Sequence, residues 1–315
     1  MKIAVSGCLL GESIRHNGGH KSDTFVNEML SEYADYISFC PEHLAFGTPR
    51  DSIRLVNHPD GIFVENNKTH QNVTDELEKF SIQELHKISA QPLSGIILKS
   101  KSPSCGLGSA ILYRTNGYSE TKGDGLFAKL CKESFPLLPI EEEGRLQDPW
   151  LRENFIMQLF AYDDFERFKK SNPGIKELIA YHQSYKFMLQ SKNDHHYREL
   201  GKIVGNHEKS NFEALFESYE TLFKKTIAIK SSIGKTRNVL EHMAGFLKKD
   251  INEVEKNTLH EQIRDYHDKI IPLITPLSTI GMLAKEYNMT YLLDQKFLDP
   301  YPKKLALRSD IRSGK

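Results

Sequence analysis

The chain has 315 residues, of which 39% are hydrophobic and 27% charged, and its formal net charge at pH 7 is zero. This composition is ordinary for a soluble protein with room for two domains. No apolar run approaches the roughly 20 residues that a membrane-spanning helix needs, so no membrane partner is expected. The apolar start of the chain is too short for a signal peptide and is broken by Ser6 and Gly7, so a cytoplasmic location is expected.

Charge is unevenly distributed along the chain. Residues 1–150 carry 15 Lys and Arg against 20 Asp and Glu, hence −5, and residues 151–315 carry 27 against 22, hence +5. This asymmetry is consistent with a polyanionic partner for the basic half. A bland solvated surface explains it equally well, and both interpretations stay open.

Short apolar runs alternate with amphipathic stretches in the first half. The pattern predicts strands at 2–6, 36–40, 61–66 (at a sheet edge), 95–100 and 135–140, and helices from Asp23 to about 30, from Thr74 to about Ser89 and over 123–134. Segment 41–56 has no clear period and is expected to be an active-site loop. Alternation of strand and helix predicts an α/β domain with an open parallel, Rossmann-like sheet.

The charge-dense segment 141–155 is expected to separate two domains, 1–148 and 149–315, with Pro149 opening a helix. Beyond it, apolar residues recur every three to four positions and no strand pattern is convincing. The second domain is therefore expected to be all-α, with six to eight helices. Its basic tail, 301–315, is expected to fray.

Three of the four cysteines each close a predicted strand beside Gly or Pro. Cys8 follows the first strand, Cys40 the second, and Cys105 the strand at 95–100. Ligands bind at the carboxyl ends of the strands in open α/β sheets, so these three thiols are expected to meet in one crevice. Cys131 lies inside a predicted helix and is expected to be a core residue.

Three thiolates at one crevice allow more than one site. They could hold an iron–sulfur cluster with one open iron, or zinc with Glu42, His20 or His43 as a fourth ligand. Their wide spacing does not match a zinc-finger pattern. They could also be three buried core cysteines, since cysteine is common in protein cores.

Polar residues near these strand ends are candidates for catalysis and binding. Glu42 stands two positions after Cys40, where it could act as a general base, or could be a solvated loop charge. Ser102 and Ser104 could bond to substrate or merely satisfy a turn. The basic loop residues could bind phosphate or a base edge, or simply balance the acidic half: Arg15, Lys21, Arg50, Arg54, Lys99 and Lys101. In the second half, the densest basic stripe is formed by Lys224, Lys225, Lys230, Lys235 and Arg237.

Several stretches of the chain resemble known families. Four occur in order in the first half: SGCLLGESIRHNGGHK, CPEHLAFGTPRDSIRL, LKSKSPSCG and EEEGRLQDP. Together they resemble the bacterial thiouracil desulfurase family (TudS), over about residues 1–148. HQSYKFMLQSKNDHHYRELGKIVGN and the ending IPLITPL…YLLDQKFLDPYPKKLALR resemble the YbgA-type helical domain. The combination is similar to desulfidases proposed to act on 4-thiouridine in tRNA.

The resemblance implies a 4Fe–4S cluster on Cys8, Cys40 and Cys105 with one open iron site. It implies that Glu42 is the catalytic acid/base, and that Ser102, with Ser104 as the alternative, is the catalytic serine. The reaction implied is non-redox removal of sulfur from 4-thiouridine in tRNA bound by the helical domain.

Two alternatives stay open. One is a desulfurase of free thiouracil or thionucleosides whose helical domain serves dimerisation. The other is a non-enzymatic, metal-containing RNA-binding regulator.

Overall fold

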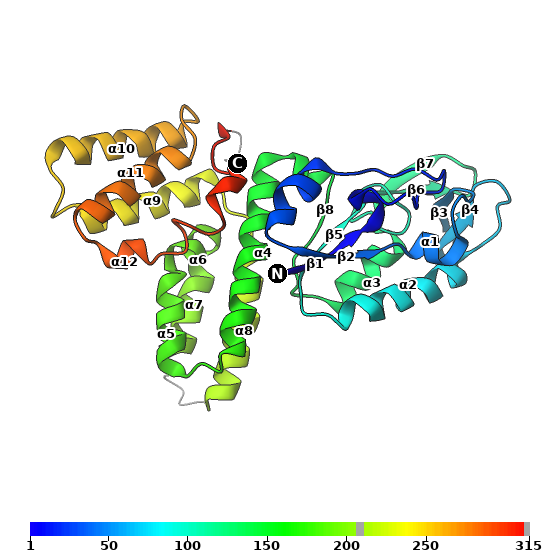
Figure 1. The fold of residues 1–315 in the computed structure, drawn as a ribbon, viewed down its shortest axis with the longest axis horizontal. Helices are drawn as coiled ribbons and strands as arrows, with labels where there is room; N and C mark the ends of the chain where they lie inside the picture. Colours follow the sequence, from blue (N-terminus) through cyan, green and yellow to red (C-terminus); the bar gives the residue numbers. More distant parts are fainter. Residues whose placement is uncertain (206–210, 312–315) are drawn as a thin grey trace. The chain divides into compact units, whose positions relative to one another are not determined.

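The computed structural model describes residues 1–205 and 211–311, and the chain divides into two compact units, Met1–Gln147 and Asp148–Lys315. Figure 1 shows the first unit as sheets with helices and the second as helices alone. The predicted order of an α/β domain followed by an all-α domain is confirmed. The division falls one residue before the predicted boundary.

A fully parallel sheet forms the centre of the first unit. It contains β1 (Lys2–Ser6), β2 (Asp35–Phe39), β5 (Leu93–Leu98) and β8 (Ile140–Glu142) in the order β2-β1-β5-β8. Every residue of β5 is buried. Strands covered on both faces read as continuous apolar runs, which is why β1 and β5 could be predicted from the sequence.

Two helices pack together in the first unit and contribute to the core beside this sheet: α2 (Thr74–Ser89) and α3 (Leu126–Ser134). Their apolar faces bury Ile88 and Phe127 completely, and the rings of Phe39 and Phe127 lie 4.9 Å apart. Cys105 belongs to the same core cluster, so this packing holds the loop after β5 in place.

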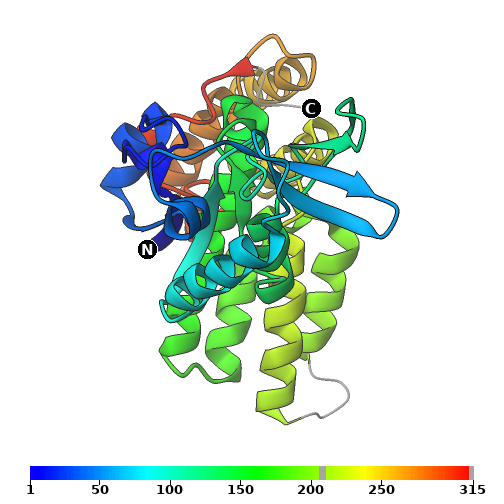
Figure 2. The same ribbon diagram turned by 90° about the vertical axis from the view of Figure 1, so that its right-hand side faces the viewer.

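A second sheet was not predicted. It contains β3 (Ile53–His58), β4 (Gly61–Asn66), β6 (Ala110–Arg114) and β7 (Ser119–Gly123) in the order β4-β3-β6-β7, with β3 and β4 forming the hairpin drawn as paired light-blue arrows in Figure 2. The edge position predicted for 61–66 is confirmed. β7 was missed because it is an exposed polar edge strand without an apolar alternation.

The prediction of a loop over 41–56 is wrong. This segment contains α1 (Pro41–Phe46), a helix of six residues, and most of β3. Six residues are too few to display a helical period, which explains the error.

Two other predicted elements are shifted or irregular. The strand expected at 135–140 begins only at Ile140 and runs to Glu142. The prediction looked for an apolar run and so missed a strand that continues through two buried glutamates. After Asp23, the chain forms a π-helical turn (Phe25–Met29) and a 3₁₀ turn (Leu30–Glu32) in place of a regular helix. The Asp23 carboxylate does accept the Val26 N–H at 3.0 Å, as a capping residue should.

The described part of the second unit contains nine α-helices, one more than the upper end of the predicted range. They are α4 (Pro149–Lys170), α5 (Ile175–Ser184), α6 (Lys186–Lys192), α7 (Asp194–Gly205), α8 (Phe212–Ile227), α9 (Ile233–Leu247), α10 (Glu253–His267), α11 (Ile274–Glu286) and α12 (Thr290–Leu293). Asp148 caps α4, and Pro149 occupies its first turn as predicted. Among the described residues, no helix is long and apolar enough to cross a membrane.

The prediction that the tail frays is wrong for residues 301–311. Tyr301, Leu305 and Leu307 are buried, and Arg308 is buried with an ion pair to Glu153. The tail is held by packing that basic composition does not reveal. Residues 312–315, the end of the predicted tail and domain, lie outside the described residues.

Candidate active site

Three cysteines lie at the carboxyl ends of neighbouring parallel strands. Cys8 sits in the 3₁₀ turn Gly7–Leu10 after β1, Cys40 directly follows β2, and Cys105 lies in the loop after β5. Because β2, β1 and β5 are adjacent and parallel, these ends share one edge, and all three cysteines line a single cavity of about 400 Å³. The predicted convergence is confirmed. Cys131 is fully buried in the core on α3, also as expected.

The loop that carries Cys105 is held by its own backbone contacts. The Ser102 hydroxyl accepts the N–H groups of Ser104 (3.2 Å) and Cys105 (3.1 Å), which closes a tight turn. The turn's carbonyls then accept the first N–H groups of α3, with Leu126 bonded to Pro103. A Cβ at Gly125 would lie 2.5 Å from the Ser104 carbonyl, so only glycine allows this approach.

Burial raises the pKa of all three thiols. Desolvation, reinforced by neighbouring Cys105, raises the pKa of Cys8 to about 12, and desolvation likewise raises the pKa of Cys40. Desolvation raises the pKa of Cys105 to about 11, although hydrogen bonds from serine hydroxyls, that of Ser104 first, oppose the rise. A bound metal cation would supply the positive charge that three thiolates need here.

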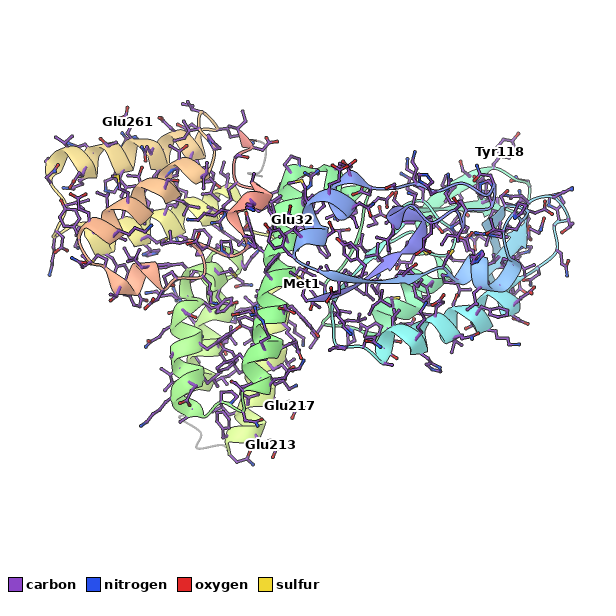
Figure 3. All side chains as sticks on the ribbon, in the orientation of Figure 1. Met1, Glu32, Tyr118, Glu213, Glu217 and Glu261 are labelled. Carbon is purple, nitrogen blue, oxygen red and sulfur yellow. The ribbon has the colours of Figure 1, made fainter. Side chains whose placement is uncertain are left out.

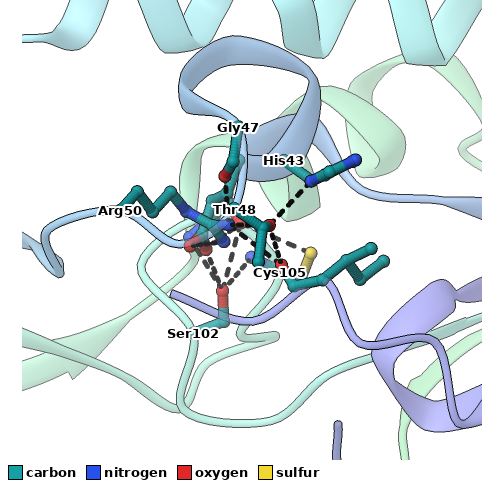
Figure 4. A network of polar contacts seen from close by, with 9 residues as sticks. His43, Gly47, Thr48, Arg50, Ser102 and Cys105 are labelled. Carbon is teal, nitrogen blue, oxygen red and sulfur yellow. Dashed lines mark hydrogen bonds and ion pairs between the residues drawn. The ribbon is translucent and has the colours of Figure 1, made fainter. Parts of the chain in front are cut away.

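The Glu42 carboxylate lies in the same cavity and accepts hydrogen bonds on both oxygens. Oε1 accepts the hydroxyls of Ser102 (2.9 Å) and Ser104 (2.7 Å), and Oε2 accepts Arg50 Nη2 at 3.0 Å. Figure 4 shows how this network joins the helix α1 region to the loop of Ser102 and Cys105. The three donors fix the orientation of the carboxylate beside the cavity, and a fixed position within reach of a bound molecule is the geometry that a general base requires.

Arg50 is bound on several sides by protein oxygens. Its Nη1 donates to the carbonyls of Ile14 and Gly47, each at 2.9 Å, while its Nη2 contacts Glu42. The side chain is only 5% exposed, although it lines the cavity. The structure therefore shows Arg50 as a residue that positions Glu42 and joins the loop after β1 to α1.

Most of the other predicted basic residues also reach the cavity. Arg15, Lys21, Lys99 and Lys101 are among its lining residues. Arg54 is not, because it stands on β3 and pairs with Glu65 at 3.4 Å.

The two histidines considered as zinc ligands lie apart from the cavity lining. His43 bonds to Thr48 at 2.7 Å, and His20 is exposed and accepts the Ser22 N–H. Within residues 1–205 and 211–311, no three His, Cys, Asp or Glu side chains are close enough together to hold a single metal ion.

Sequence reasoning missed the carboxylates that support the cysteine loop. Glu143 accepts the N–H and hydroxyl of Ser100 (2.6 and 2.8 Å) and forms an ion pair with Lys99. Glu142 accepts the Leu107 N–H at 3.0 Å and the Ser109 hydroxyl. Their run of three glutamates indicated a domain boundary. Its position at the end of a predicted strand of the same sheet was the signal for a role beside the cavity.

The basic stripe predicted in the helical unit is not one surface. The Lys224 side chain is 6% exposed and pairs with Glu166 (2.5 Å) and Glu220 (2.6 Å). Lys224 is therefore already neutralised inside the fold, and naming it as an RNA contact was wrong.

The other four residues of the stripe differ in exposure. Lys225 and Lys230 are exposed, and Arg237 is half-buried. Lys235 is exposed, and its ammonium donates to the Lys192 carbonyl.

Comparisons with known proteins match the two units separately. Residues 3–143 match the family model described as 2-thiouracil desulfurase, and residues 186–302 match a protein of unknown function, DUF1722. A solved [4Fe-4S]-dependent thiouracil desulfidase, TudS, is 30% identical, with 46% of this chain and 93% of that chain covered and a TM-score of 0.38.

Two curated relatives divide the chain in the same way. The uncharacterized protein YbgA of Escherichia coli is 25% identical over 154 residues, which are 49% of this chain and 91% of that protein. The uncharacterized protein YbbK of Bacillus subtilis is 29% identical over 138 residues, covering 42% and 90%.

Proposed function

This chain is a desulfurase that belongs to the 2-thiouracil desulfurase family, and we propose that it hydrolyses the carbon–sulfur bond of 4-thiouridine in tRNA, leaving uridine and sulfide. The observation that carries the proposal is the Glu42 carboxylate, held by two serine hydroxyls in the cavity that three cysteines line. A purely structural metal site has no need of such a group. The family assignment favours the enzyme over a regulator without activity.

The proposed cofactor is a 4Fe–4S cluster held by Cys8, Cys40 and Cys105. The donor set suits it, because three thiols spread round an open cavity can each bind a different iron, whereas a single ion needs ligands that converge. The TudS relative is a [4Fe-4S]-dependent enzyme by its own description. When bound, a cluster with an open iron supplies a soft Lewis acid for the sulfur atom of the substrate.

Glu42 acts in this proposal as the general base. It takes one proton from water as the water oxygen bonds to the ring carbon, and this proton passes to the sulfur as the carbon–sulfur bond breaks. The second proton of the water leaves the oxygen as the carbonyl forms, so the products are the uracil carbonyl and hydrogen sulfide. No electrons are gained or lost, so no redox partner is required. Arg50 donates to one oxygen of the carboxylate, and the serine hydroxyls donate to the other, so both sides of the group are held in place.

Ser102 is the proposed catalytic serine. Both serine hydroxyls donate to the same Glu42 oxygen, but Ser104 is 1% exposed and also lies 3.4 Å from the Cys105 sulfur. Ser102 is less buried, so its hydroxyl is the better placed of the two to contact a ring held in the cavity. Arg15 and Lys21, on the cavity wall, are proposed to contact the substrate.

A free thiolated base or nucleoside is the second candidate substrate. It is supported by the description of the TudS relative as a thiouracil desulfidase, while the basic character of residues 151–315 supports tRNA.

The two candidate substrates are compared by measuring sulfide release under anaerobic conditions with the iron-loaded full chain. One reaction contains tRNA with 4-thiouridine, and the other contains free 4-thiouracil. Faster turnover of tRNA at equal concentration is expected. Turnover of the free base alone would leave the desulfurase but remove tRNA as its substrate.

A further inference from the structure

An aromatic cluster with a lysine lies on three helices of the helical unit. The rings of Phe246 on α9 and Tyr291 on α12 are stacked with their centroids 5.0 Å apart. Phe187 on α6 meets both rings edge-on, at 5.9 and 6.5 Å. The Lys186 ammonium lies 5.3, 5.1 and 5.8 Å from the centroids of Phe187, Phe246 and Tyr291.

Two of these rings are open to solvent. Phe246 is 43% exposed and Tyr291 36% exposed, whereas Phe187 is fully buried beneath them. Leaving a large aromatic side chain exposed forgoes the free energy that its burial would contribute. Because the two exposed rings stack on each other, a further planar group can extend the stack only on an outer ring face. The buried Phe187 gives these rings a rigid base.

Lysines lie on the elements that carry the rings, together with two exposed acidic residues, Asp250 after α9 and Asp294 after α12. In the described part of the chain, no carboxylate lies within ion-pair distance of Lys186, whose recorded contacts are with the rings. Lys248 and Lys249 directly follow α9 and are exposed. These lysines differ from Lys224, whose charge is neutralised by ion pairs with two glutamates. The lysines here remain available to an anion.

We infer that Phe246 and Tyr291 form a stacking platform for an unpaired base of RNA, with Lys186, Lys248 and Lys249 facing its phosphates. This inference rests on the proposed action on tRNA and specifies the surface that would bind it. Stacking on aromatic side chains next to basic groups is how proteins hold unpaired bases without reading sequence. The cation already poised over the rings favours a negatively charged occupant over an apolar peptide.

The test compares RNA affinity of full-length variants, with a single-stranded oligouridylate and an unmodified tRNA transcript as probes. Phe246→Leu with Tyr291→Leu keeps apolar cover over Phe187 but removes the flat rings. Its affinity is expected to fall roughly 5- to 100-fold with an unchanged salt slope, because stacking rather than charge is lost. Lys186→Met is expected to lower the RNA affinity. It should also reduce the slope of log affinity against log salt concentration, by about 0.7 per lost phosphate contact.

Controls separate this inference from the proposed function. Tyr118, labelled in Figure 3, is 74% exposed at a hairpin of the first unit, and Tyr118→Leu should leave RNA affinity unchanged. Turnover of free 4-thiouracil should be unchanged in every variant. Equal RNA affinity of the Phe246→Leu, Tyr291→Leu variant and the natural chain would overturn the platform while tRNA remains the substrate.

Two further outcomes would also overturn it. If the natural chain binds neither probe, the platform and the tRNA proposal both fail. If the leucine variant changes the molecular mass in light scattering while its RNA affinity is retained, the rings form a contact between copies of the chain.

Discussion

Two Glu–Arg pairs, one in each unit, have nearly the same chemistry but different surroundings. Glu42 and Arg50 lie 3.0 Å apart with side chains 15% and 5% exposed, and Glu153 and Arg308 lie 2.9 Å apart with side chains 6% and 5% exposed. The first pair lines a cavity of about 400 Å³. The second lines a space of only about 10 Å³, which admits no more than a water molecule.

The partners of each carboxylate follow the same division. Glu153 accepts the Tyr301 hydroxyl at 3.2 Å in addition to Arg308, so its contacts tie the tail to α4. Glu42 accepts two serine hydroxyls beside three cysteines. A buried ion pair is therefore not in itself a sign of function. The open volume and the chemically active neighbours distinguish the catalytic candidate from the structural bridge.

The largest expected effect comes from the cysteines that define the first region. Replacing Cys8, Cys40 or Cys105 by Ser should abolish both bound iron and sulfide release, because each is proposed to hold one iron of the cluster. Cys131→Ser is the matched control and should retain iron, since Cys131 is enclosed in the core. Iron per chain after anaerobic reconstitution is the measurement. Loss of iron in the control with retention in Cys8→Ser would contradict the assignment.

Glu42→Gln should lower turnover by about a hundred- to ten-thousand-fold while iron content is kept. The amide retains the size of the side chain but cannot serve as a base. Initial rates and iron content of the same preparation check this. If the variant lost its iron together with its activity, Glu42 would belong to the cluster site. If the variant kept its iron and turned over at a near-normal rate, Glu42 would have no catalytic role.

The matching change in the other region should affect stability. Glu153→Gln leaves the buried Arg308 guanidinium without its counter-charge, so the free energy of unfolding should fall by about 3–5 kcal/mol. Turnover on free 4-thiouracil should be retained in the folded variant. Urea unfolding measures the loss, and Glu199→Gln, which breaks an exposed pair with Lys202, is the control without effect. An unchanged urea midpoint in Glu153→Gln would refute the structural role.

A smaller effect should appear as pH dependence at Lys192, in the same core. Its Nζ donates to Asn154 at 2.7 Å, and desolvation lowers its pKa to about 7, although Glu153 opposes the shift. Between pH 7 and its ordinary value of 10.5 the unfolded chain binds the proton that the folded chain has released, so stability rises with pH. The cost of burying the charge is full below pH 7.

Lys192→Met should therefore remove this rise. Urea unfolding of both chains at pH 6, 8 and 10 should show the variant gaining most at pH 6, by on the order of a few kcal/mol relative to its difference at pH 10. Parallel pH profiles of the two chains would mean that the core does not favour the neutral amine form of Lys192.

The amino-acid sequence determined the local elements whose signals lie within one window. The apolar runs of β1 and β5, the start of α4 at Pro149 and the 3.6-residue period of the second half are short-range patterns, and they appear where expected. The position of three cysteines at strand ends was enough to predict their convergence, because parallel neighbouring strands end on one edge.

Only the tertiary structure decided which polar groups meet across the chain. Glu42 finds Ser102 sixty residues away, Glu143 supports the loop of Ser100, and Glu166 neutralises Lys224. Such pairings depend on how the elements pack, and a charged residue looks the same in the sequence whether it faces solvent or a buried partner. The burial that makes these contacts strong is a property of the assembled fold, and no single segment of the chain contains it.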